Sequence, residues 1–192
     1  MKTLLLCCKT IEREIQLAME QTGVWVDWNI LNEFSVKYNA ELKRLTESIY
    51  RLAGEKFNIN SPVQLGKILF EKLRIGEGTQ KSKSRKNYTT TAEGLEKYAD
   101  DYEIVRLLLR YRQIHKLNST YVEGFKPLVI QGKVHTTYNQ MNTSTGRLSS
   151  ANPNLQNIPV RNEEGKELRK IFIAGPGNVL VDADYSQIEL RI

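Results

Sequence analysis

The chain has 192 residues, 40% of them hydrophobic and 26% charged, which is typical of a globular protein long enough to bury a core. Its two cysteines, Cys7 and Cys8, are adjacent, which excludes a disulfide framework and favours a reducing compartment. The apolar start is too short for a secretory signal, and no stretch approaches the length of a membrane span. We therefore expect a cytoplasmic location without membrane association.

Positive charge gathers in the middle of the chain. The formal net charge is +6, and residues 81–150 carry 12 basic and 6 acidic side chains, whereas the segments on either side are nearly neutral. A localised basic region is expected of a protein that binds a polyanion. A solvated basic surface would produce the same distribution, so charge alone leaves both interpretations open.

Helical periodicity dominates the first part of the chain. Apolar residues at helical spacing predict an amphipathic helix over residues 10–21, and a short extended link follows at 24–27. A second apolar stripe runs from Leu31 to Leu52 and predicts a long helix that ends at Gly54.

Capping signals predict the next helix. Ser61 is a suitable N-cap, Pro62 fits the first helical position, and Gln64 has the spacing of a capping box, with the helix continuing to Leu73. Residues 74–90 are polar, cationic and short of core residues, which predicts an exposed loop.

Two more helices are expected after this loop. Thr90 and Glu93 form a capping signal for the first of them. The second is indicated by apolar residues at helical spacing between Ile104 and Ile114, and it extends towards Tyr121.

The pattern changes after about residue 128. Alternation over residues 134–138 predicts a strand, and residues 139–159 are rich in Asn, Ser, Thr and Pro. Residues 179–181 are a candidate buried strand, with a helix beginning near Ile188. We therefore expect an α+β chain: a helical part to about residue 125, then a part with too few strands for a complete sheet.

Asp184 follows the apolar segment and precedes Tyr185. A carboxylate at the end of a buried strand can bind a hard cation such as Mg²⁺. An isolated aspartate at a strand-to-helix junction more often caps the helix. The neighbouring sequence decides between these interpretations.

Five segments resemble family A (bacterial DNA polymerase I-like) DNA polymerases in order and spacing. Residues 184–191 read DYSQIELR, which is similar to motif A of that family. The other segments are TGRLSS at 145–150, PNLQNIP at 153–159, the YRQ…KL.STY pattern at 111–121 and FNINSP at 57–62. The resemblance extends from about residue 10 to the last residue.

The resemblance implies a helical thumb subdomain followed by an incomplete antiparallel-sheet palm. In these terms, residues 1–27 are a helix and link leading into the palm. Residues 28–125 are the thumb, with a basic tip loop at about 74–90, and residues 126–192 are a partial palm that ends in motif A. The implied activity is template-directed transfer of deoxynucleotides to a primer 3′-hydroxyl, in DNA replication or repair.

The resemblance also implies a two-metal site. Asp184 and Tyr185 are its catalytic and metal-binding residues, through a carboxylate and a backbone carbonyl that bind Mg²⁺. Gln187 and Glu189 match substrate-binding positions, and Glu189 excludes a ribose 2′-hydroxyl. Arg147 matches an arginine that tests base-pair geometry in the minor groove.

A further set of residues is implied to contact primer-template DNA. Small polar and basic side chains suit contacts with phosphate and sugar. Without the resemblance, a solvated helix face or a turn-rich surface loop would explain them equally well. The implied DNA-binding residues are Arg112, Lys116, Ser119, Thr143, Ser144, Thr145, Arg147, Asn154, Gln156, Asn157 and Arg161.

One residue differs from the family pattern, and the two histidines are not among its matched residues. Asn118 lies where the family is expected to have a lysine, which predicts one weaker phosphate contact. His115 and His135 have no partners at metal-ligand spacing and are interpreted as structural.

The chain ends inside the helix that motif A opens, before the family's fingers helix and second metal-binding aspartate. One carboxylate cannot hold two metal ions, so we expect no polymerase activity from the chain alone. The expected partners are primer-template DNA, a dNTP and a second chain carrying the fingers and the rest of the palm. A non-catalytic primer-template-binding module and a truncated remnant are the alternatives. Glu189 argues against a single-subunit RNA polymerase.

Overall fold

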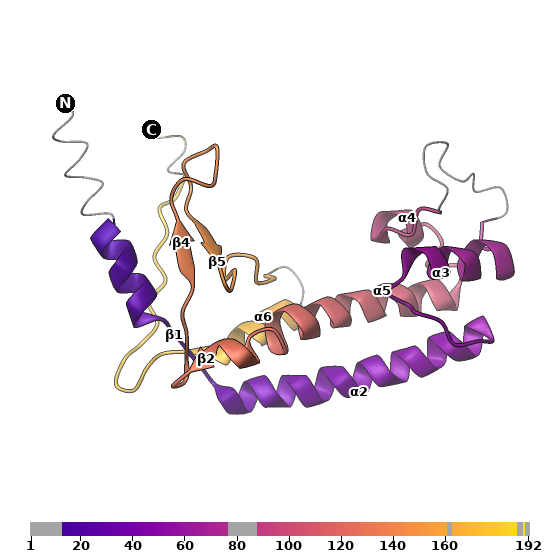
Figure 1. Ribbon diagram of the computed structural model, residues 1–192, viewed down its shortest axis with the longest axis horizontal. Helices are drawn as coiled ribbons and strands as arrows, with labels where there is room; N and C mark the ends of the chain where they lie inside the picture. The colour runs from indigo at the N-terminus through magenta and orange to yellow at the C-terminus, as the bar shows by residue number, and fades with distance from the viewer. Residues whose placement is uncertain (1–12, 77–87, 161–162, 188–189, 191–192) are drawn as a thin grey trace. The chain divides into compact units, whose positions relative to one another are not determined.

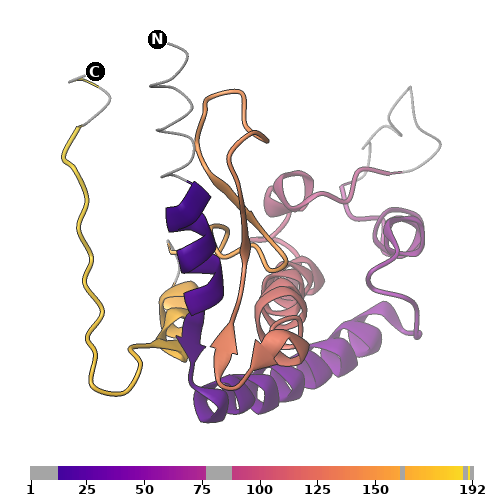
Figure 2. The same ribbon diagram turned by 60° about the vertical axis from the view of Figure 1, so that its left-hand side comes forward.

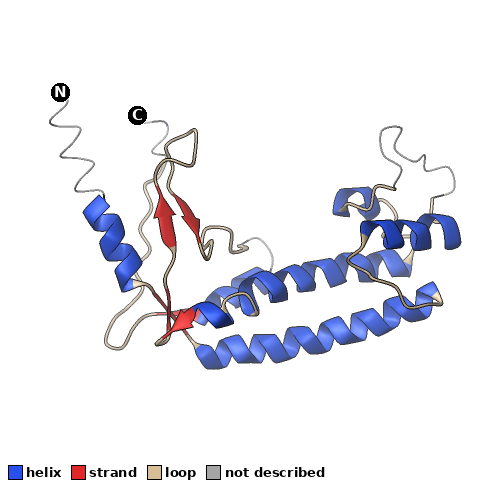
Figure 3. Ribbon diagram, viewed as in Figure 1, coloured by secondary structure: helices blue, strands red, loops and turns tan. Residues whose placement is uncertain are grey.

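The computed structural model describes residues 13–76, 88–160, 163–187 and 190. Helices and small antiparallel sheets make up the chain (Figure 3), so the predicted α+β class is confirmed. Contacts divide the chain into two compact units, Met1–Asn32 with Gly124–Ile192, and Glu33–Glu123. The assignment of residues 1–27, 28–125 and 126–192 to palm lead-in, thumb and palm stays a prediction.

The long predicted helix is α2, which spans Trp28–Ala53 (Figure 1). Asp27 caps its start, because its Oδ1 accepts hydrogen bonds from the backbone N–H groups of Asn29 at 2.9 Å and Ile30 at 3.1 Å. Gly54 follows its last residue with a φ of +73°, a left-handed conformation that glycine adopts without strain.

The unit of residues 33–123 is otherwise built from short helices and one further long helix. Two of the segments have π-type hydrogen bonding and directly continue an α-helix. The elements after α2 are α3 (Pro62–Gly66), η1 (Lys67–Lys72), α4 (Ala92–Glu96), α5 (Glu103–Lys116) and η2 (Leu117–Val122).

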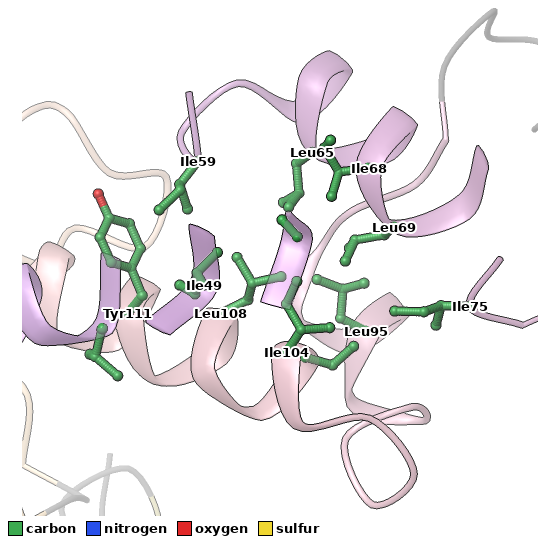
Figure 4. Packing of buried hydrophobic residues seen from close by; sticks show 13 residues of the cluster. Ile49, Ile59, Leu65, Ile68, Leu69, Ile75, Leu95, Ile104, Leu108 and Tyr111 are labelled. Carbon is green, nitrogen blue, oxygen red and sulfur yellow. The ribbon is translucent and has the colours of Figure 1, made fainter. Parts of the chain in front are cut away.

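One core fills the inside of this unit. Ile49 of α2, Leu65 of α3, Leu95 of α4 and Leu108 of α5 are all 0% exposed and belong to one cluster. Figure 4 shows how these side chains converge from the separate helices. The predicted stripe on α2 is therefore the buried face of that helix.

The caps differ in detail from the prediction. Ser61 accepts from the backbone N–H of Gln64 at 3.4 Å, as expected of an N-cap. The capping box does not form, because the Gln64 Oε1 accepts from the N–H of Asn58 at 2.7 Å. The N–H of Ser61 is already bonded to the carbonyl of Asn58 at 3.0 Å, so it does not need Gln64.

The cap of α4 lies one residue later than predicted. Thr91 caps the helix through its Oγ1, which accepts from the N–H of Gly94 at 3.2 Å. Thr90 is 7% exposed and its carbonyl accepts a hydrogen bond from Arg112. The N-cap of α4 is therefore Thr91 and not Thr90.

The predicted exposed loop at 74–90 falls mostly on residues 77–87, which lie outside the described part of the chain. Its two ends contradict the prediction. Ile75 is 1% exposed and belongs to the core. The ring of Tyr88 lies 4.9 Å from that of Phe70. A Cβ on Gly66 would lie only 3.1 Å from the Tyr88 Cβ, so the glycine permits this close packing.

The other unit contains two sheets and a helix over residues 13–22. The larger sheet is antiparallel in the order β2–β3–β1–β6, and a hairpin of β4 and β5 forms the second. The strands are β1 (Val24–Val26), β2 (Val129–Ile130), β3 (Lys133–Val134), β4 (Thr137–Asn139), β5 (Ser149–Ala151) and β6 (Phe172–Ile173), and the remaining helices are η3 (Lys126–Leu128), α6 (Glu163–Leu168) and η4 (Arg169–Ile171).

The single strand predicted over residues 134–138 is wrong. The chain leaves one sheet at Val134 and enters the other at Thr137. Between them, the His135 Nδ1 lies 2.7 Å from the carbonyl oxygen of Glu20, and the hydroxyl of Thr136 donates to the carbonyl of Pro153 at 2.8 Å. These side-chain bonds bend the chain from one sheet to the other. His135 has the structural role predicted for it.

None of the helices in the described segments is long and apolar enough to span a membrane.

Candidate nucleic-acid interface

The first part of the candidate site is the turn between β4 and β5. Arg147 is exposed near the end of this turn, and its carbonyl accepts from the hydroxyl of Thr143 at 2.6 Å. Gly146 has a φ of +73°, which supplies the left-handed residue that the turn requires. Ser144 and Thr145 are exposed beside it. The turn therefore presents a short row of polar side chains and one guanidinium.

Ser150 joins this turn to the loop that follows β5. Its hydroxyl is buried and donates to the Asn154 Oδ1 at 3.1 Å, and it accepts from the N–H of Leu155 at 3.0 Å. The same Asn154 oxygen accepts from the N–H of Gln156 at 2.9 Å. The loop is thus wrapped around one buried hydroxyl.

Gln156 makes the second connection between loop and strand. Its Oε1 accepts from the N–H of Ser150, and its Nε2 donates to the carbonyl of Leu148, both at 3.1 Å. The TGRLSS and PNLQNIP segments therefore fold as one hydrogen-bonded unit. Asn154, Gln156 and Asn157 are all exposed residues of this unit.

A separate group of predicted DNA-binding residues lies on α5 and η2, in the unit of residues 33–123. Lys116 is exposed near the C-terminus of α5. Ser119 is also exposed, and its hydroxyl donates to the carbonyl of His115 at 2.7 Å, so the side chain lies along the helix. Of these two residues only Lys116 is charged, and a lysine side chain is long enough to place its ammonium group well beyond the helix surface.

Arg112 differs from Lys116. It is only partly exposed, and its guanidinium donates to the carbonyl of Thr90. Burial lowers the pKa of Arg112 from its ordinary value. An arginine stays protonated at neutral pH even so. In this structure Arg112 links α5 to the residues before α4, and a phosphate contact would use its remaining N–H groups.

Asn118, which stands where a lysine is expected, is buried, and the weaker phosphate contact stays a prediction. It is 6% exposed, and its Nδ2 donates to the Asn39 Oδ1 at 2.9 Å. The hydroxyl of Ser35 donates to the Glu123 Oε1 at 2.5 Å, and the Asn39 Nδ2 lies 3.4 Å from both groups. Asn118 therefore belongs to a polar network between α2 and η2. The nearby Tyr121 is buried, which raises the pKa of its phenol.

The segment around Asp184 contradicts the predicted buried strand. Val179 and Val181 are 79% and 83% exposed, and residues 178–185 have no regular secondary structure (Figure 2). A strand needs a partner for its backbone groups and a cover for its apolar face. The described residues supply neither to this segment. Asp184, Tyr185 and Gln187 are likewise exposed.

The oxygen atoms of this segment could bind Mg²⁺ only together with further ligands. A carboxylate from Asp184 and a carbonyl from Tyr185 are oxygen ligands, which Mg²⁺ prefers. Within the described ranges, however, no three His, Cys, Asp or Glu side chains gather where they could hold a metal ion. The predicted residues Arg161 and Glu189 lie outside the described part of the chain.

Sequence reasoning missed the residues that build the site. Ser150 and Thr136 were not among the predicted binding residues. Their hydroxyls nevertheless form hydrogen bonds that hold the loop at residues 151–155 in place. The only available signal was their position inside or near polar motifs, which does not reveal burial.

The fold and the candidate site define an α+β protein with exposed polar and basic side chains, and comparisons with known proteins give its family. The model of the family described as DNA polymerase family A matches residues 28–192. The chain belongs to DNA polymerase family A.

Its curated relatives are much longer proteins. DNA polymerase I of Bacillus subtilis is 52% identical over 177 residues, which are 91% of this chain and 20% of that protein. DNA polymerase I of Lactococcus lactis is 50% identical over 180 residues, or 93% of this chain and 20% of that protein. The chain thus spans about a fifth of the length of these relatives.

A solved structure shares the fold. It is described as the POL domain of Pol1 from M. smegmatis in complex with DNA primer-template and dNTP. It is 36% identical with a TM-score of 0.79, and the match covers 92% of this chain and 31% of that one.

Proposed function

We propose that this chain is the part of a DNA-directed DNA polymerase that holds primer-template DNA and supplies one carboxylate to the catalytic centre. The observation that carries the proposal is the hydrogen-bonded unit of β4, β5 and the following loop. It presents Arg147 and neighbouring polar side chains on a frame held by Ser150 and Gln156. Such a frame suits contacts that position a duplex without reading its sequence.

Three groups of residues have roles in this proposal. Arg147 inserts into the minor groove of the primer terminus, where every base pair shows acceptors. Lys116 and Ser119 contact backbone phosphate, assisted by the partly buried Arg112. Thr143, Ser144, Thr145, Asn154, Asn157 and Arg161 lie along the sugar-phosphate path, and Gln187 and Glu189 face the incoming dNTP.

Asp184 and the carbonyl of Tyr185 would hold Mg²⁺ in a site that further ligands complete. When bound, magnesium supplies positive charge that offsets the charge of the triphosphate. The two donors of this segment are exposed and accessible. Further polymerase segments, the fingers and the remaining palm, would complete this site, and the exposed apolar residues 179–181 are where the added sheet would pair.

The first test is primer extension. We expect the purified chain to show no template-dependent incorporation, since no three His, Cys, Asp or Glu side chains of the described residues gather where they could hold a metal ion. Addition of a polypeptide that carries the remaining segments of the B. subtilis relative should produce incorporation. Incorporation by the chain alone would contradict the predicted dependence on a second chain. Failure of the mixture would favour the alternative of a non-catalytic primer-template-binding module.

The second test concerns duplex binding by Lys116. We expect Lys116→Ala to weaken binding of a primer-template hairpin and to reduce the slope of log affinity against log salt by about 1, as for one lost phosphate contact. Fluorescence anisotropy between about 50 and 200 mM salt measures both quantities.

Lys56→Ala is the matched control for this test. Lys56 is exposed just after the end of α2, and its replacement removes the same charge. The control should leave affinity and slope nearly unchanged. Equal effects of the two substitutions would mean that Lys116 acts only through the net charge of the chain.

A further inference from the structure

We infer that Gln156 is a positioning residue, which fixes the backbone beside Arg147 by completing the open edge of β5, and that it does not contact DNA itself. The inference rests on the proposed function in one respect, the contact of Arg147 with DNA. The bonds of Gln156 to β5 do not depend on that function. The inference changes the role that the sequence resemblance implies for Gln156.

The geometry begins with the two edges of β5. On one edge, Ser149, Ser150 and Ala151 pair with the residues of β4. Backbone groups alternate between the two edges of a strand, so residues two apart present theirs on the same side. The carbonyl of Leu148 and the N–H of Ser150 therefore lie on one edge, which is the edge that Gln156 binds.

The carboxamide of Gln156 takes the place of a peptide group from a further strand. It accepts from the N–H of Ser150 and donates to the carbonyl of Leu148, both at 3.1 Å. A peptide group of a neighbouring strand would offer the same one donor and one acceptor. Open strand edges fray unless their groups are bonded, so Gln156 extends the order of β5 towards the turn.

The effect reaches Arg147 because two successive backbone carbonyls, its own and that of Leu148, each accept a hydrogen bond from a side chain. The carbonyl of Arg147 accepts from the hydroxyl of Thr143 at 2.6 Å, and the next carbonyl, that of Leu148, accepts from Gln156. The residue before it, Gly146, has no atom within 4 Å of the position of a Cβ and gives the turn no packing support. The hydrogen bonds from the Thr143 and Gln156 side chains therefore help to hold the backbone of Arg147 and Leu148 in place.

A direct DNA contact by Gln156 would break this arrangement. Turning the carboxamide towards a base removes the partner of the Ser150 N–H, and Ser150 is only 4% exposed. An unbonded polar group in such a place is costly. Gln156 and Arg147 are both exposed residues, so the difference between them lies in the bonds of Gln156 to β5. In this inference Gln156 keeps its carboxamide on β5, and Arg147 is the residue that contacts DNA.

A double-mutant cycle in the full chain tests the inference. We expect Gln156→Ala to weaken binding of a primer-template hairpin about three- to tenfold, the size of effect of one or two lost neutral hydrogen bonds. If Gln156 acts through Arg147, the same substitution in the Arg147→Ala background should have almost no further effect. Additive losses would mean that Gln156 makes its own contact, and they would overturn the inference.

Amide hydrogen exchange provides a readout that does not depend on DNA. Gln156→Ala should accelerate exchange of the Ser150 amide, and Gln156→Glu should do so less because it keeps the acceptor. Thr145→Ala, in the same turn but outside these bonds, should leave that exchange unchanged. Unchanged exchange in Gln156→Ala would overturn the inference. Lack of duplex binding by the unaltered chain would instead overturn the proposed function, while exchange would still decide whether Gln156 holds β5.

Discussion

Replacing Leu108 with alanine is expected to lower the free energy of unfolding by about 2–5 kcal/mol, as is usual for a fully buried leucine. Leu108 is 0% exposed and lies at the centre of the cluster that α2, α3, α4 and α5 share (Figure 4). Few of its neighbours can move to fill the space, because they come from different helices. Urea unfolding followed by circular dichroism at 222 nm measures the effect, since this unit is mainly helical.

Val36→Ala is the matched control for this substitution. Val36 is on α2 in the same unit and is 71% exposed, so its truncation should change the free energy of unfolding by less than about 0.5 kcal/mol. Similar losses from the two variants would show that the cluster does not determine the stability of the helical unit.

The helices were predictable because their signals are local. The stripe from Leu31 to Leu52 repeats at the spacing of a helix, and the buried residues of α2 follow it. Ser61 was also predictable, since a cap acts on the residues immediately after it. The position of the α4 cap was not, because Thr90 and Thr91 have the same capping side chain and only the folded chain shows that Thr91 accepts from the N–H of Gly94.

The strands were predicted less well for the opposite reason. Alternation at residues 134–138 is compatible with a continuous strand, and only the side-chain bonds of His135 and Thr136 to distant carbonyls divide it between two sheets. Residues 179–181 have the composition of a buried strand and are exposed in the structure. Composition indicates what a segment tends to form, whereas pairing requires a partner strand.

For the candidate site, the sequence predicted where the residues lie better than what each residue does. The sequence motifs located the turn of Arg147 and the loop of Asn154 to Asn157. They gave no sign that Gln156 bonds to the backbone of β5 or that Ser150 is buried beneath the loop. For Asn118 the sequence indicated only a replaced lysine, and the structure places the residue in the network with Asn39. A motif identifies residues that act together but does not separate contact from support.

The largest effect on function is expected from Asp184→Asn. The variant is best tested in a chimera, where these 192 residues replace the corresponding segment of the B. subtilis DNA polymerase I, which is 52% identical over 177 residues. We expect the rate of primer extension to fall roughly 10²-fold or more, the size of effect seen when one preorganised electrostatic group is removed from an active site. Asparagine keeps the size of the side chain and removes its charge, so binding of the primer-template duplex should stay nearly unchanged.

Asp182→Asn provides a close comparison, because Asp182 lies two residues earlier in the same exposed segment and carries the same charge. If Asp184 is a ligand of the catalytic metal, the rate should depend on Asp184 far more than on Asp182. If both variants lose activity equally, the segment contributes only negative charge, and the metal-binding role of Asp184 is wrong. If neither loses activity, the carboxylate is not part of the catalytic centre, although the DNA-binding role of the hairpin could still hold. The pair of variants therefore distinguishes a specific metal ligand at Asp184 from a general effect of negative charge in this segment.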